Sequence, residues 1–343
     1  MELDIKIGQL LMAGFRGLTA DPDDPIIRDI RRHHLGGVVL FDCDVPLASD
    51  ERKIQSAAQV RALIGTLQEA AAKPLLVAVD QEGGQVRRLR EAVDFPPLPS
   101  AQALGAGGDP EQTRRAAAET ARALVELGFN LNLAPVVDLN LNPQSPVIGG
   151  IERCFSADPA EVVQHARAFV EGHRQYGVPC TLKHFPGHGS AADDSHFDLV
   201  DVTQTWSRVE LEPYAELIAA GLADAIMTAH VFNRNLDPDF PATLSQAAIG
   251  DLLRGELHYD GVVITDDVQM GAVANHYGLE TAVERTLMAG VDIVVLANNT
   301  LYEEDAVPRV CACIRRLVAE GRIDEGRIDA SCTRIAKLKG LAA

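Results

Sequence analysis

The sequence predicts an α/β protein of one domain, residues 1–343, folded as a (β/α)8 TIM-type barrel. Short apolar, β-branched runs recur eight times, and segments with helical spacing lie between them. No Ser/Gly-rich linker or internal repeat marks a second domain. Apolar strands that alternate with helices indicate a parallel sheet covered on both faces. Eight such units favour a closed barrel over the alternative, an open doubly wound sheet with an accessory domain.

The expected strands begin with the run IGQLLMAGF and end with VDIVVLA. From the N-terminus they span residues 7–15, 36–41, 74–80, 129–139, 179–185, 224–231, 261–267 and 291–297. Between them, helix-forming residues at helical spacing predict helices over 51–72, 110–128, 159–177 and 279–290. Glycines typical of helix C-termini follow several helical segments, at Gly128, Gly177, Gly221 and Gly290.

Two connections are longer than a barrel requires. Residues 81–109 are rich in Gly, Arg and Pro, and residues 186–205 begin with PGHGSAADDSH. Each connection follows the C-terminal end of an expected strand, which is the face where barrel enzymes build their active sites. Long loops in compact domains are commonly functional, so we expect both to contribute to a site.

Composition limits the classes of partner. The chain has 31 Lys and Arg against 49 Asp and Glu, a net charge of −18, which opposes binding to nucleic acid or to an anionic membrane. No apolar run approaches the roughly 18 residues that span a bilayer. The six cysteines are scattered, and the N-terminus lacks the pattern of a signal peptide. We therefore predict a cytoplasmic protein with reduced thiols.

Polar side chains gather at the expected C-terminal ends of four strands. One such residue alone is often the N-cap of the next helix. Six at the same end of a barrel instead indicate a catalytic site. These residues are Asp80, Lys183, His184, His230, Asp266 and Asp267.

The densest stretch is KHFPGHG at 183–189, followed by Asp-Ser-His at 194–196. His184 and His188 have the spacing of helical zinc ligands, but Pro186 and the glycines at 187 and 189 exclude a regular helix. We therefore predict no metal, and we assign His188 to the scaffold of a tight turn. No phosphate-binding glycine motif is present, so no cofactor is expected.

The Asp-Ser-His segment suggests proton transfer. In an extended segment, residues two apart share a side, so the Asp194 carboxylate can approach a ring nitrogen of His196. Such a partner fixes the tautomer and favours the imidazolium, which leaves the other nitrogen as a general acid and base near neutral pH. The alternative is an exposed loop histidine with no chemical role.

Three motifs in this order resemble glycoside hydrolase family 3: DQEGG at 80–84, KHFPGHG with DSH downstream, and TDD at 265–267 after a GVVI strand. More narrowly, the chain is similar to the single-domain bacterial β-N-acetylglucosaminidases that recycle peptidoglycan. The likeness extends from LLMAGF to the ANN at 297–299. The combination of KHFPGHG with DSH is highly specific, whereas DQEGG or TDD alone is a weak signal.

The resemblance implies a retaining glycosidase in which Asp266 is the nucleophile, His196 the acid/base and Asp194 the residue that orients His196. A retaining enzyme needs one ionised carboxylate to attack the anomeric carbon and one proton donor for the leaving oxygen. Neighbours in an extended segment point oppositely, so only one of Asp266 and Asp267 is expected to face the barrel axis. The resemblance selects Asp266, because family members that lack the second carboxylate keep the first. By the same resemblance, the residues that bind the sugar are Asp80, Arg88, Arg153, Lys183 and His184.

Two segments depart from the family pattern. The residues Phe41-Asp42-Cys43-Asp44 stand where F-x-RN is common, and Cys154 replaces the usual Ser in the segment IGGIERCF that contains Arg153. Trp206 has two interpretations, stacking on a sugar ring or packing at the start of a helix.

The predicted reaction is exo-hydrolysis of a terminal β-linked N-acetylglucosamine through a covalent glycosyl-Asp intermediate. The predicted partner is a small carbohydrate or muropeptide from cell-wall recycling. Three alternatives remain: a β-N-acetylglucosaminide phosphorylase, because a histidine acid/base tolerates an incoming phosphate better than a carboxylate does; a β-glucosidase of the same family; and a non-catalytic sugar-binding barrel.

Overall fold

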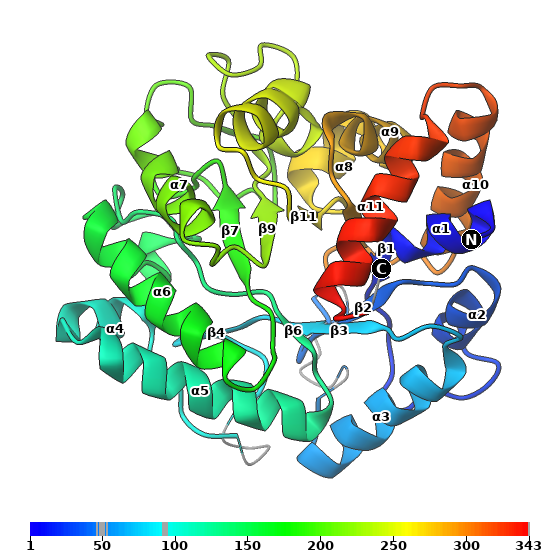
Figure 1. The fold of residues 1–343 in the computed structure, drawn as a ribbon, viewed down its shortest axis with the longest axis horizontal. Helices are drawn as coiled ribbons and strands as arrows, with labels where there is room; N and C mark the ends of the chain where they lie inside the picture. The colour runs from blue at the N-terminus through cyan, green and yellow to red at the C-terminus, as the bar shows by residue number, and fades with distance from the viewer. Residues whose placement is uncertain (46, 48–51, 53, 91–94, 342–343) are drawn as a thin grey trace.

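A computed structural model describes residues 1–45, 47, 52, 54–90 and 95–341. Figure 1 shows helices arranged around a central set of strands, with the two chain termini close together. One sheet contains eight strands: β1 (Leu11–Ala13), β2 (Gly37–Leu40), β3 (Leu76–Val79), β6 (Leu131–Asn132), β7 (Thr181–Phe185), β9 (Ala225–Thr228), β11 (Val262–Asp267) and β12 (Ile293–Leu296).

The sheet closes into a barrel. Its strand order is β6-β3-β2-β1-β12-β11-β9-β7, and neighbouring strands are parallel. The outermost strands of this order, β6 and β7, meet through parallel bridges between Asn132 and Cys180 and between Val136 and Lys183. The N–H of Val137 also donates to the carbonyl of Lys183 at 2.8 Å. The predicted barrel is confirmed.

Helices follow the strands around the barrel. In the described residues the α-helices are α1 (Leu3–Gln9), α2 (Pro25–Arg32), α3 (Ala57–Ala70), α4 (Ala101–Gly107), α5 (Pro110–Leu127), α6 (Pro159–Arg174), α7 (Glu212–Ala219), α8 (Gly271–Tyr277), α9 (Leu279–Ala289), α10 (Ala306–Ala319) and α11 (Glu325–Leu338). A π-helix spans Ala247–Glu256. None of these helices has the length and apolar character that crossing a bilayer requires.

The four predicted helices correspond to α3, α5, α6 and α9. Left-handed glycines end α5 and α9, as the sequence suggests for Gly128 and Gly290. The Asp109 and Asp158 side chains cap the starts of α5 and α6. Helix α3 begins at Ala57 rather than at 51, after the N-cap Ser56. Residues 51 and 53, within the predicted range, lie outside the described part of the chain.

Each predicted strand is longer than the strand observed, and the excess is largest at two places. The run 7–15 divides between α1, which continues to Gln9, and the three-residue β1. An apolar run does not by itself distinguish a buried helix from a strand. The run 129–139 contains β6 over only Leu131–Asn132. Pro135 follows, and because it has no N–H it cannot donate to a strand ladder.

The two long connections contain short strands of their own. In the first, β4 (Gln81–Gly83) pairs antiparallel with β5 (Val86–Arg87). In the second, β8 (Val200–Asp201) pairs with β10 (Val231–Phe232), which follows β9. Both connections therefore fold against the C-terminal end of the barrel.

Apolar side chains fill the opposite end. Ala225, Val262 and Ile293 stand at the starts of their strands and belong to one buried cluster. Ile335 of α11 completes this cluster, so the C-terminal helix closes the N-terminal end of the barrel. The cavity that the predicted site residues line lies at the other end, the C-terminal end of the strands.

A buried carboxylate fastens α11 to the strands. Asp292, which precedes β12, accepts hydrogen bonds from the N–H of Val263 at 2.9 Å and from Arg254 at 2.7 Å. On α11, Ser331 donates to the same carboxylate, and Arg334 does so at 3.4 Å. The Asp292 side chain is fully buried, so these partners balance its charge in a region of low dielectric constant.

We expect Asp292→Ala to lower the free energy of unfolding by about 3–5 kcal/mol, because it leaves partly buried guanidinium groups and a buried backbone N–H without their carboxylate. Urea denaturation followed by circular dichroism measures the change. Arg122→Ala is the control, since it removes an exposed pair with Glu126 on α5 and should change stability little. Equal losses in the two variants would contradict the assignment.

Candidate active site

A cavity of about 240 Å³ opens at the C-terminal end of the barrel. Its walls come from the ends of the strands and from the loops that follow them, as the sequence predicts for the site. The lining includes all the residues to which the sequence analysis assigns a catalytic or binding role: Asp80, Arg88, Arg153, Lys183, His184, Asp194, His196 and Asp266.

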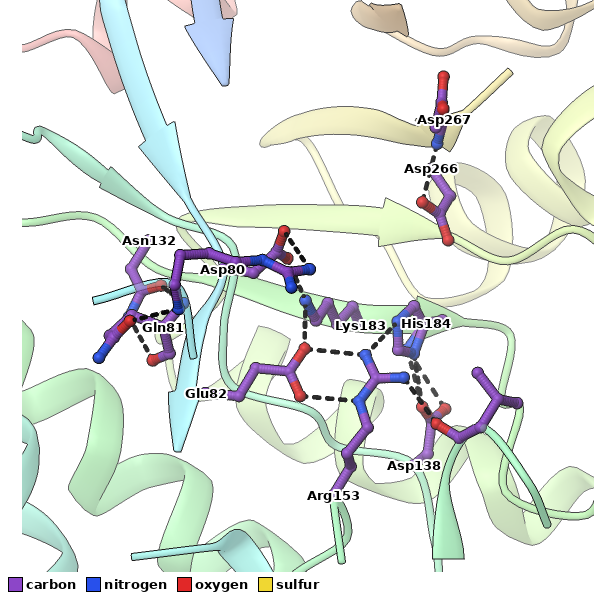
Figure 2. A network of polar contacts seen from close by, with 12 residues as sticks. Asp80, Gln81, Glu82, Asn132, Asp138, Arg153, Lys183, His184, Asp266 and Asp267 are labelled. Carbon is purple, nitrogen blue, oxygen red and sulfur yellow. Dashed lines mark hydrogen bonds and ion pairs between the residues drawn. The ribbon is translucent and has the colours of Figure 1, made fainter. Parts of the chain in front are cut away.

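One wall is a buried network of charges (Figure 2). Lys183 of β7 contacts Asp80 at 2.8 Å and Glu82 at 2.6 Å. Arg153 donates two hydrogen bonds to Glu82, each 2.8 Å long. Burial disfavours the charge on Glu82, but Arg153 and Lys183 outweigh this effect and hold its pKa well below the ordinary value. Glu82 thus fixes both cations at the cavity wall.

His184 is held by a second carboxylate. Its Nδ1 lies 2.7 Å from Oδ2 of Asp138, and its Nε2 lies 3.2 Å from Nη2 of Arg153. Because a guanidinium cannot accept a hydrogen bond, Nε2 must accept here, which places the proton of a neutral ring on Nδ1. Asp138 also accepts from the backbone N–H groups of His184 and His188. Burial alone would raise the pKa of Asp138. His184 and His188 lower this pKa by a larger amount, so the net shift is downward.

Sequence reasoning did not select Glu82 or Asp138. Glu82 was visible as the third residue of DQEGG, and Asp138 as a carboxylate near the end of the predicted strand 129–139. Neither position shows which cation it faces, since Glu82 and Arg153 are 71 residues apart and Asp138 and His184 are 46 apart.

Arg88 lies between two carboxylates. Its guanidinium is 3.7 Å from Asp80 and 3.5 Å from Asp42, and Arg90 reaches Asp42 at 3.0 Å. The segment that departs from F-x-RN therefore supplies a carboxylate that faces arginines. Its last residue, Asp44, instead pairs with Arg16 at 2.7 Å, and Asp44 does not line the cavity.

The two carboxylates that end β11 differ in environment. Asp266 accepts a hydrogen bond from the N–H of Asp267 at 2.8 Å. Burial raises its pKa, but His230, His184 and His196 together outweigh burial and lower the pKa to about 2. Burial raises the pKa of Asp267 to about 6, although the N–H groups of Gln269 and Ala297 partly offset this rise. Asp266 is thus the strongly ionised carboxylate.

Both carboxylates line the cavity, although strict alternation along a strand would expose only one of them. The register of β11 against β12 shifts between Ile264 and Asp267, which removes the strict alternation. The Asp267 carboxylate is nevertheless occupied, because it accepts from Ala297 N at 3.0 Å and from Gln269 N at 3.1 Å.

His196 and Asp194 form a pair at the mouth of the cavity. Nδ1 of His196 lies 2.6 Å from Oδ1 of Asp194, so Nε2 remains available for proton transfer. Burial lowers the pKa of His196, but the hydrogen bond with Asp194 and the charges of Asp266 and Asp194 raise it above the ordinary value. The His196 side chain is 45% exposed, which gives it access to a substrate group outside the pocket.

The other residues that the sequence singled out make hydrogen bonds within the protein. Trp206 donates from Nε1 to the carbonyl of Pro186 at 3.0 Å and is not among the residues that line the cavity, which favours the packing interpretation. His230 lies 2.8 Å from Thr243 and 2.8 Å from the carbonyl of Asp267. His188 is buried and contacts Ser195. In the described residues, no three His, Cys, Asp or Glu side chains are arranged to hold a metal ion.

Comparison with known proteins identifies the family. Residues 2–338 match the family described as "Glycosyl hydrolase family 3 N terminal domain". The chain belongs to glycoside hydrolase family 3. It is therefore a glycoside hydrolase, and the predicted resemblance is confirmed.

Relatives in bacteria carry the name Beta-hexosaminidase. The protein of Xylella fastidiosa (strain M23) is 40% identical over 304 residues, which cover 86% of this chain and 85% of the relative. The protein of Tolumonas auensis is 38% identical over 302 residues, with 84% and 83% covered.

Solved structures of the same family share the fold. A β-N-acetylglucosaminidase from Paenibacillus sp. superposes with a TM-score of 0.90 at 39% identity, over 99% of this chain and 62% of the other. A β-N-acetylhexosaminidase from Beutenbergia cavernae superposes with a TM-score of 0.89 at 31% identity, over 99% of both chains. This chain thus spans less than two thirds of the Paenibacillus enzyme.

We expect Glu82→Gln to raise KM for an aryl glycoside substrate by about ten- to hundredfold, because the loss of a charged hydrogen-bond partner loosens both Arg153 and Lys183. Steady-state kinetics with the purified variant measures this change. The matched control is Glu152→Gln, which also removes one negative charge. Glu152 is exposed and is not among the residues that line the cavity. A KM that rises equally in both variants would mean that only overall charge matters.

Proposed function

We propose that the chain is a retaining β-N-acetylhexosaminidase that removes a terminal β-linked N-acetylglucosamine from its substrate. The observation that carries this proposal is the placement of a strongly ionised carboxylate, Asp266, and a separate His196–Asp194 pair in one cavity. The names of the relatives support the choice of an N-acetylated amino sugar.

In the first step, a carboxylate oxygen of Asp266 attacks the anomeric carbon and forms a glycosyl ester. The bond between that carbon and the leaving oxygen breaks, and the proton on Nε2 of His196 passes to this oxygen. Asp194 holds the other ring nitrogen at 2.6 Å, so its negative charge stabilises the imidazolium before transfer.

In the second step, neutral His196 accepts a proton from a water molecule as the water oxygen attacks the anomeric carbon. The ester bond breaks, the sugar leaves with retained configuration, and Asp266 returns as a carboxylate. Its low pKa suits both steps, since Asp266 is ionised when it attacks and is a good leaving group afterwards. Asp267 is less suited, because its Oδ1 accepts from two backbone N–H groups and burial raises its pKa to about 6.

The charged wall is proposed to bind the sugar hydroxyls. The side chains of this wall already form ion pairs and hydrogen bonds with one another, so substrate binding need not restrict their conformations. Carboxylate oxygens accept from hydroxyl protons, whereas ammonium and guanidinium groups donate to hydroxyl oxygens. The residues in this role are Asp80, Arg88, Arg153, Lys183 and His184.

The natural substrate proposed is a small muropeptide or disaccharide released from peptidoglycan, with recycling in the cytoplasm. This finer proposal rests on the family resemblance of the KHFPGHG and DSH motifs. Digestion of purified muropeptides, followed by mass spectrometry of the products, tests it. Intact muropeptides after prolonged incubation with an enzyme that cleaves aryl substrates would exclude this class of substrate.

A phosphorylase is the second candidate, because the proposed acid/base is a histidine and not a carboxylate that would repel phosphate. Addition of inorganic phosphate to the same assay separates the two reactions. A phosphorylase turns over faster with phosphate and yields a sugar phosphate, whereas the proposed hydrolase yields free sugar at an unchanged rate.

With matched aryl β-N-acetylglucosaminide and β-glucoside substrates, we expect the wild-type enzyme to cleave only the acetamido sugar. Asp266→Ala should lose activity by about a thousandfold or more, because no other carboxylate replaces the nucleophile. Release of aryl alcohol measures both results, and mass spectrometry of protein quenched during turnover should find the sugar on Asp266.

The outcomes are distinct. Cleavage of the glucoside at an equal rate favours the β-glucosidase. If neither sugar is cleaved, the hydrolase proposal fails, and a sugar-binding barrel describes the chain better. Thermal unfolding of Asp266→Ala alongside the wild type shows whether lost activity reflects chemistry or folding.

The acid role of His196 predicts a decline of kcat/KM as pH rises through its pKa, since only the protonated ring donates. Asp194 raises this pKa, so Asp194→Asn should move the decline to lower pH. A kcat/KM profile across the neutral range measures the shift. Asp193→Asn is the control, because Asp193 is exposed, lies outside the cavity and should leave the profile in place.

A further inference from the structure

The turn that carries the proposed acid/base, residues 194–197, packs on the start of α8. The N–H of Gly271 donates to the carbonyl of His196 at 3.0 Å, and the N–H of Ala272 donates to the carbonyl of Ser195 at 3.3 Å. Asn275 donates from its side chain to the carbonyl of Phe197 at 3.1 Å. Three successive residues of the turn are therefore held by α8 through their backbone oxygens.

Glycine at position 271 permits this close approach. A Cβ atom there would overlap the backbone carbonyl of Phe197 and would lie 3.0 Å from the carbonyl oxygen of His196. Both obstacles are backbone atoms, so the turn itself would have to move to admit a side chain. The contact between α8 and the turn at 194–197 therefore requires a residue without a Cβ atom at position 271.

A side chain holds the turn from its other side. Ser195 is 3% exposed, and its hydroxyl lies 3.3 Å from Nε2 of His188. His188 is equally buried, and its N–H donates to Asp138 at 2.8 Å, which ties it to the turn at the end of β7. Burial lowers the pKa of His188 to about 4, so the ring is neutral near pH 7 and adds no charge beside His196.

The position of α8 gives these contacts a chemical consequence. Strand β11 carries Asp266, ends at Asp267 and is followed by α8, which begins at Gly271. A turn that packs on α8 is therefore fixed relative to the nucleophile. We propose that Gly271 and Ser195 are positioning residues that set the location of His196 in the cavity relative to Asp266. The proposal rests on the acid/base role of His196 in the proposed function.

Leaving-group dependence tests the proposal, because a weakly basic leaving group departs without a proton and a strongly basic one does not. We expect Gly271→Ala to lower kcat/KM for a methoxyphenyl β-N-acetylglucosaminide by about tenfold or more, and to change kcat/KM for the dinitrophenyl substrate by less than about twofold. Ser195→Ala should show the same selective loss. A variant that merely unfolds loses both substrates in proportion.

Gly65→Ala is the matched control. Gly65 lies within α3, and a Cβ there would meet no atom within 4 Å, so both substrates should be cleaved as by the wild type. Alanine also favours helix over glycine, so Gly271→Ala does not weaken α8 through helix propensity. If Gly271→Ala fails to fold, Ser195→Ala carries the test, since it removes a single hydroxyl.

His196→Ala separates this inference from the proposed function. If it loses the methoxyphenyl substrate selectively while Gly271→Ala and Ser195→Ala match the wild type, the positioning role is wrong and the acid assignment stands. If His196→Ala lowers kcat/KM by the same factor for the methoxyphenyl and the dinitrophenyl substrates, the acid assignment itself fails. Equal loss of both substrates in folded Gly271→Ala also overturns the positioning role, because the damage then extends beyond proton donation.

Discussion

The site depends on how the barrel closes between β6 and β7. Strand β6 is only two residues long, so beyond it the contact between the two ends of the sheet runs through the bridge of Val136 with Lys183. Further along, the Asp138 carboxylate accepts from the N–H groups of His184 and His188. A side chain thus replaces a strand carbonyl as the acceptor. The same closure directs Lys183 and His184 into the cavity, so barrel integrity and binding geometry share one set of contacts.

Charge environment separates the two proposed catalytic groups. Asp266 is partly buried at the cavity wall, and the surrounding histidines lower its pKa, whereas the pKa of His196 rises through the charges of two carboxylates. Each group favours the ionisation of the other. The negative charge of Asp266 stabilises protonated His196, and the positive charge of His196 stabilises ionised Asp266. A nucleophile and a proton donor can therefore coexist at one pH without a second carboxylic acid. Divergent environments of this kind are how one site assigns acid and base roles.

The sequence predicted what depends on local pattern. Periodicity and apolar runs located the eight strands, and the motifs located the residues with a proposed catalytic or sugar-binding role, which line one cavity. The side-chain pairs of the site could not be predicted from the sequence, because Glu82 meets Arg153, and Asp138 meets His184, only when distant segments come together in the fold. Strand ends were also misjudged where a helix or a proline interrupted an apolar run, as at 7–15. The contact of Gly271 with the turn at residues 194–197 has no local signature in the sequence, since it joins a loop and a helix from different βα units.

The two proposed catalytic groups reach the cavity by different routes. Asp266 stands on a strand, where the sheet fixes its backbone, but His196 stands on a loop that contains several Gly, Ala and Ser residues. A loop of this kind gains precision only from contacts outside itself. Here those contacts come from α8, which follows the strand that carries Asp266, and from His188 in the turn after β7. The barrel thus fixes one reactive group directly and the other through tertiary contacts, so the acid/base can be displaced without disturbing the nucleophile.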